Sequence, residues 1–150
     1  MDRQTLIATA AALPAFPPSA ANAYAAAREQ LVATVNRLLG ARPDIDRLLG
    51  PDNREMMANN HANHARFVET VLADLHPEML VDTVLWVFRA YRSHGFSLAY
   101  WPAQLNAWLD AMSEHLGAED AAAIEPLYRW FIVQQPAFTS LSDAQLADGI

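Results

Sequence analysis

Two histidines on one predicted helix are the side chains in this sequence best suited to hold a metal ion or contact a ligand. His61 and His64 are three positions apart, near one helical face, and Asn59, Asn60 and Asn63 surround them. Two imidazoles alone are too few for a zinc site. The structural alternative for these residues is a polar histidine pair at the helix surface, or a hydrogen-bonded histidine of the core.

Motifs for catalysis are absent from the chain. Glu55, Glu69, Glu78 and Glu114 do not form the paired Glu-x-x-His motifs of a di-iron bundle. The sequence contains no Ser/His/Asp arrangement and no glycine-rich phosphate loop. It has no cysteine, which excludes disulfides, thiolate metal sites and thioether-linked cofactors. We therefore expect that this chain is not an enzyme by itself.

Composition and charge limit the partners. The chain of 150 residues, 53% of them hydrophobic, suits a single domain over residues 1–150 with one sizeable core. Acidic residues outnumber basic ones by 17 to 10, a formal net charge of −7. Binding to nucleic acid or to an anionic membrane surface needs clustered lysine and arginine, so neither partner is expected.

The N-terminal stretch resembles a signal peptide in its apolar run, but its flanks differ from that pattern. Asp2 beside Arg3 leaves little net positive charge before the run, and Pro14, Pro17 and Pro18 interrupt its second half. We therefore expect a first short helix and a cytoplasmic protein. No apolar run approaches the roughly 20 residues of a membrane span, so no membrane partner is expected.

Apolar periodicity predicts an all-α chain of six to seven helices without strands or repeats. The stretch that includes Trp86 and Phe88 is apolar almost all round, which predicts a central, buried helix. Pro126 predicts a kink or a later start in the last long helix, and Pro136 predicts its end. The expected helices cover residues 2–13, 20–39, 53–75, 76–94, 102–116 and 120–135, with a short helix in 41–52 and one turn after Ala137.

The segment from Tyr91 to Gly117 carries a sharp corner between two helices. Gly95 suits the left-handed residue that closes a helix, Phe96 turns into the core, and Pro102 suits the first turn of the next helix. The spacing of these residues resembles the corner between the last helices of bacterial globins. The order of the predicted helices is also similar to that of a globin. The resemblance implies a globin-like helical bundle.

The residue that defines globin chemistry is missing from this chain. The family holds haem iron through a histidine four residues before the corner glycine, and that position is Tyr91. A tyrosinate also binds ferric haem where a nearby cation lowers the phenol pKa from about 10, and Arg89 and Arg92 are close in sequence. The resemblance also places His61 and His64 over the distal side of the pocket, where one of them would be an iron ligand or contact a bound gas. The alternative for Tyr91 is a core aromatic residue.

We expect an apolar pocket between the predicted helices 53–75 and 76–94, which in globins are held apart by haem. A small apolar or tetrapyrrole-like ligand would occupy it, with His64 and Tyr91 as its polar groups and as metal ligands only if haem binds. Collapse of the two helices onto bulky side chains is the alternative. The expected pocket residues are His64, Phe67, Val68, Val71, Val84, Val87, Tyr91 and Phe96.

Three functions remain open at this point. The first is a globin-like sensory, regulatory or ligand-binding module without conventional haem ligation. The second is a haem protein with an unusual iron ligand, serving gas sensing, electron transfer or haem handling. The third is an interaction module that forms a homodimer through its last two helices, which requires that Trp108, Tyr128 or Trp130 remain exposed.

Overall fold

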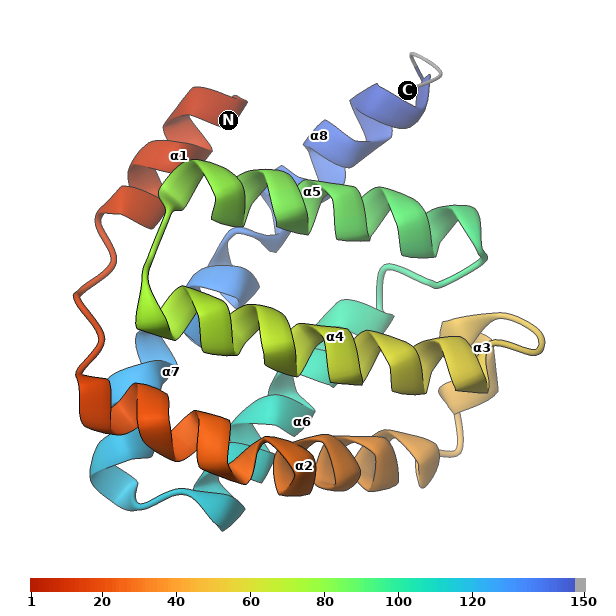
Figure 1. Cartoon of the computed structure of the whole chain (residues 1–150). Helices are drawn as coiled ribbons and strands as arrows, with labels where there is room; N and C mark the ends of the chain where they lie inside the picture. The colour runs from red at the N-terminus through yellow and green to blue at the C-terminus, as the bar shows by residue number, and fades with distance from the viewer. Residues whose placement is uncertain (148–150) are drawn as a thin grey trace.

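The computed structural model of the chain describes residues 1–147, which form eight α-helices and no strand (Figure 1). The predicted all-α helical bundle is therefore confirmed, with one helix more than expected. The helices are α1 (Arg3–Ala11), α2 (Pro18–Gly40), α3 (Ile45–Leu49), α4 (Arg54–Ala73), α5 (Pro77–Ser93), α6 (Tyr100–His115), α7 (Ala118–Val133) and α8 (Gln135–Ala147).

The helices pack as two groups. In one, α2 packs against both α4 and α6 and also contacts α7; in the other, α5 lies against α1 and α8. The consecutive helices α4 and α5 do not form a comparable packed pair, although Figure 1 shows them running side by side across the same face. No helix in the described chain combines the length and the hydropathy that crossing a bilayer requires.

The corner between α5 and α6 forms where the sequence predicts it. Gly95 has a φ of 102°, a left-handed conformation that glycine adopts without steric cost, and α5 ends just before it. The loop before α4 docks here: Asn53 donates from its amide to the carbonyls of Leu49 and His94, at 2.7 and 2.8 Å. Two corners far apart in sequence are thus held together, and both adjoin the long helices α4 and α5.

The first helix is an integral part of the bundle. Leu6 and Ala10 are completely buried, and α1 lies along α5. The guanidinium of Arg3 makes two hydrogen bonds to the carboxylate of Asp82 and one to Glu78, all within 2.9 Å. These contacts fix the outer side of α5 relative to the N-terminus.

The prediction that α5 is a central, buried helix is wrong. Trp86 is 59% exposed and Met79 is 47% exposed, whereas Phe88 and Val84 are buried. The helix lies at the surface between α1 and α8, so only the stripe that faces them is covered. Aromatic side chains favour burial in the core because they carry the largest apolar area, but Trp86 on α5 stays exposed.

The C-terminal region also differs from the prediction. Residues 135–147 form the full helix α8 instead of one turn, and Pro136 lies in its first turn instead of only ending α7. Helix α7 begins at Ala118, earlier than expected, and continues through Pro126. Phe138 of α8 is buried against Phe88 and Trp130, which explains why this amphipathic segment folds onto α5.

The aromatic residues of α6 and α7 belong to the core. Trp108 and Tyr128 are completely buried and Trp130 is 6% exposed, with its indole N–H donating to Thr9 at 2.9 Å. These three side chains therefore do not form the exposed aromatic surface that a homodimer through these helices requires.

Candidate functional site

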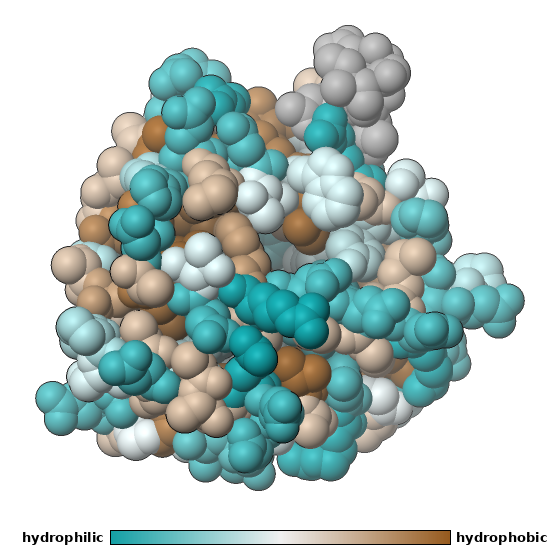
Figure 2. All heavy atoms as spheres, in the orientation of Figure 1, coloured by the Kyte–Doolittle hydropathy of each residue, from teal (hydrophilic) through white to brown (hydrophobic). Residues whose placement is uncertain are grey.

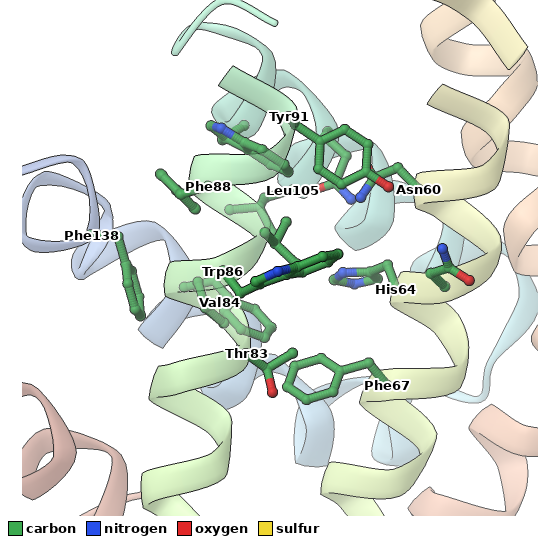
Figure 3. A pocket seen from close by; sticks show the side chains of 15 residues that line it. Asn60, His64, Phe67, Thr83, Val84, Trp86, Phe88, Tyr91, Leu105 and Phe138 are labelled. Carbon is green, nitrogen blue, oxygen red and sulfur yellow. The ribbon is translucent and has the colours of Figure 1, made fainter. Parts of the chain in front are cut away.

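A cavity of about 220 Å³ separates α4 from α5. Figure 2 shows its mouth as a hollow between these helices, with hydrophobic side chains inside. Figure 3 shows His64 and Phe67 projecting from α4 toward Thr83 and Trp86 of α5. The lining side chains are Asn60, Asn63, His64, Phe67, Thr83, Val84, Trp86, Val87, Phe88, Tyr91, Trp101, Gln104, Leu105, Phe131 and Phe138.

Five of the eight expected pocket residues line this cavity: His64, Phe67, Val84, Val87 and Tyr91. The other three are buried in the core instead, and they are Val68, Val71 and Phe96. The two valines of α4 come one helical turn after His64 and Phe67, at i+4, and at that level of the helix they are buried in the core. Phe96 comes after the corner and stacks edge-on against Tyr100 and Tyr91, at centroid distances of 4.9 and 5.1 Å.

His64 forms part of the inner wall and is held by the core. Its Nε2 atom lies 2.8 Å from the hydroxyl of Tyr128, which lies 2.9 Å from the hydroxyl of Tyr24. Its ring packs on Trp108, with centroids 4.6 Å apart. Burial among these groups lowers the pKa of His64 to about 3, and proximity to His61 contributes to the same shift. The imidazole is therefore neutral at physiological pH.

His61 is completely buried, so of the two structural alternatives it is a histidine of the core and not one at the helix surface. One ring nitrogen bonds to the amide oxygen of Asn36 on α2, and Nε2 lies 3.0 Å from the hydroxyl of Tyr100. That hydroxyl donates to the side-chain oxygen of Asn60 at 2.6 Å. Desolvation lowers the pKa of His61 to about 3. These hydrogen bonds hold the side chain of Asn60 in place at the edge of the cavity.

Tyr91 lies at the end of the cavity nearest the corner, against the edge of Trp101 at 5.9 Å between centroids (Figure 3). Its neighbour Arg92 forms an ion pair with Asp143 of α8. The phenol therefore gains no hydrogen-bonded cation from that arginine. A tyrosinate at Tyr91 would need such a cation.

These residues do not fit a haem iron. The Nε2 atom of His64 is engaged by Tyr128, and Arg92, one of the two cations next to Tyr91 in the sequence, is paired with Asp143 instead. The cavity volume also lies below the roughly 300–1,000 Å³ of sites for ligands of drug size, and a porphyrin is larger still. Across the described residues, no group of three or more His, Cys, Asp or Glu side chains could hold a metal ion.

Two polar residues at the cavity wall were not identified from the sequence. Trp101 and Gln104 are 4% and 1% exposed, and both line the cavity. The indole Nε1 of Trp101 and the amide Nε2 of Gln104 are buried without a hydrogen-bond acceptor in the described structure. One feature of the sequence indicates Gln104. It is an amide on the buried face of a helix, three residues after Trp101 and four before Trp108.

No family model, no curated protein and no solved structure matches this chain significantly.

Proposed function

We propose that this chain is a sensory or regulatory module that binds a small, largely apolar molecule between α4 and α5 without ligating haem. The observation that carries the proposal is the cavity itself. Its walls are mainly aromatic and aliphatic, and its described lining residues include no lysine, arginine, aspartate or glutamate. Apolar walls with a few polar groups are the usual form of a small-molecule site.

The size of the cavity favours a ligand of one or two rings. Its volume of about 220 Å³ exceeds the about 150 Å³ of an engineered cavity that stays dry and binds benzene. A ligand of this size would supply van der Waals contacts that the atoms of the cavity wall otherwise lack. We expect binding to be driven by burial of the ligand's apolar surface.

The position of the cavity suits a sensor. It lies between the group of α2, α4 and α6 and the group of α5, α1 and α8, so a ligand contacts both. Phe138 carries the contact to α8, the last helix of the described chain. A ligand that prefers one spacing of α4 and α5 would shift the population toward that spacing. The globin-like architecture is part of this proposal, supported by Gly95 and by Pro102 in the first turn of α6.

A cavity-filling variant tests the proposal. Val87→Trp should place an indole in the cavity, and Val133→Trp, at a site 68% exposed elsewhere, is the matched control. We expect indane, a two-ring hydrocarbon, to raise the melting temperature of wild type and of the control. A ligand that binds only the folded state must stabilise it.

The filled variant should show no such shift. Absence of a shift in wild type at indane concentrations up to its solubility limit would refute the proposal. An equal shift in Val87→Trp would mean that the hydrocarbon binds elsewhere.

A further inference from the structure

A series of hydrogen-bonded side chains connects the cavity with a second hollow, a groove of about 290 Å³ between α2 and α4 that Asn36 lines. The amide of Asn36 contacts Nδ1 of His61, whose Nε2 lies 3.0 Å from the hydroxyl of Tyr100. That hydroxyl lies 2.6 Å from the amide oxygen of Asn60, which lines the cavity. We call these four residues the histidine relay.

The three contacts of the relay need three hydrogen atoms. The phenol of Tyr100 supplies one and a neutral imidazole supplies one, so with both amide oxygens facing inward the relay would need an imidazolium. Burial lowers the pKa of His61 to about 3, which keeps the imidazole neutral at physiological pH. One amide must therefore turn by half a rotation, which exchanges its oxygen and nitrogen with little change in shape. Asn36 and Asn60 then face the relay with opposite groups.

Two arrangements satisfy all three contacts. In the first, Asn60 accepts from Tyr100, the imidazole carries its hydrogen on Nε2, and Asn36 donates to Nδ1. In the second, every hydrogen bond is reversed and the imidazole carries its hydrogen on Nδ1. The 2.6 Å and 3.0 Å contacts of the Tyr100 hydroxyl have the lengths of an O–H···O bond to Asn60 and an N–H···O bond from His61. The structure thus follows the first arrangement at this end, and Asn36 is the amide that turns.

The outer side of the Asn60 amide is open to a ligand. Its nitrogen makes no hydrogen bond in the described structure, and the fully enclosed unpaired side-chain nitrogens of the described chain all lie on α6 instead. Figure 3 shows this side chain reaching from α4 toward Tyr91 at the corner end of the cavity. A ligand group that donates to Asn60 needs its oxygen facing outward, which is the second arrangement.

We propose that the histidine relay carries the state of the cavity to the groove between α2 and α4. A ligand that donates a hydrogen bond to Asn60 holds the oxygen of that amide outward and shifts the population to the second arrangement. The amide of Asn36 then presents its N–H groups in the groove in place of its oxygen. Both ends change together because an intermediate arrangement leaves a buried polar group unpaired. This inference rests on the proposed function, since it names how a ligand in the same cavity is reported at the surface.

A variant at the cavity end tests the relay without a ligand. In Asn60→Leu the hydroxyl of Tyr100 keeps an acceptor only by donating to His61, so we expect the imidazole hydrogen to move from Nε2 to Nδ1. Nitrogen NMR at neutral pH distinguishes the two tautomers, and His61→Gln assigns the signals. Asn63→Leu is the matched control, because Asn63 lines the same cavity outside the relay, and it should keep the hydrogen on Nε2.

Indole and indene test the part of the ligand in the wild-type protein. The two molecules share one ring skeleton, but only indole carries an N–H donor. Both should raise the melting temperature, because each binds the folded state. Only indole should move the imidazole hydrogen of His61 to Nδ1. The scalar coupling that an N–H···N bond transmits between Asn36 and His61 should be present with indene and absent with indole.

The two experiments separate the possible failures. The same tautomer of His61 in wild type and in Asn60→Leu would overturn the relay. Indole that raises the melting temperature without changing this tautomer would overturn the coupling and leave the proposed function standing. No rise in melting temperature with either compound would refute the proposed function and, with it, the ligand as the trigger of the relay.

Discussion

The Nε2 atom of His64 lies 2.8 Å from the hydroxyl of Tyr128, and this contact ties a wall of the cavity to the core of α7. Tyr128→Phe removes the hydroxyl and leaves the buried polar groups of His64 and Tyr24 without their shared partner. We expect the free energy of unfolding to fall by about 1–3 kcal/mol.

Denaturant unfolding measures this loss. Tyr24→Phe is the control, because it removes only the hydroxyl that is farthest from His64 in this series of hydrogen bonds. The contact between His64 and Tyr128 stays intact. A smaller loss is expected for it. Equal losses in the two variants would show that the contact to His64 adds nothing to stability.

The two buried histidines should make stability depend on pH. Burial lowers the pKa of His61 and His64 from 6.5 to about 3, so the unfolded chain binds more protons between these values. The stabilising contribution is complete above pH 6.5 and declines as the pH falls toward 3. At pH 5 the loss should be on the order of 2 kcal/mol for each histidine.

Urea unfolding at several pH values gives the slope. His61→Gln and His64→Gln should each flatten the pH dependence between 6.5 and 4, whereas His76→Gln, at an exposed site, should not. The same slope in all three variants would assign the pH dependence to carboxylates instead.

The loop before α4 approaches the corner after α5 so closely that Gly50 has no space for a side chain. A Cβ atom at Gly50 would lie 2.9 Å from the carbonyl oxygen of Gly95, and the φ of 79° at Gly50 disfavours other residues. We expect Gly50→Ala to lower the free energy of unfolding by about 1–3 kcal/mol. Gly40→Ala is the control, since a Cβ there meets no atom within 4 Å, and should be neutral or stabilising.

Thermal unfolding of the two alanine variants distinguishes these outcomes. A melting temperature of Gly50→Ala that equals that of wild type would mean that the two corners separate at little cost.

Two aromatic residues on α5 should differ in their importance for stability. Phe88→Ala empties a buried site against Trp101 and Phe138 and should cost about 3–5 kcal/mol. Trp86→Ala, at the mouth of the cavity and 59% exposed, should cost far less. Denaturant unfolding compares them, and a larger loss for Trp86 would contradict the observed orientation of α5.

The helices and the corner arise from local chemistry in the sequence. Periodic apolar residues predict each long helix, and Gly95 ends α5 because a left-handed residue closes a helix and glycine adopts that conformation freely. The resemblance to globins, together with the size of the side chains, also predicts five of the residues that line the cavity, among them His64 and Tyr91. These features depend on neighbours three or four positions away, which a sequence displays directly.

The remaining features depend on contacts between distant segments. Helix α8 forms as a full helix that buries Phe138 against α5, and Trp86 stays outside because α1 and α8 already cover the rest of that helix. His61 is buried between Asn36 and Tyr100, which are distant from it in the sequence and lie within hydrogen-bond distance of its ring nitrogens. The sequence by itself therefore determined the helices and one face of each. Only the tertiary structure decided which face is covered and which buried polar groups find a hydrogen-bond partner, because burial and hydrogen-bond satisfaction belong to the packed chain.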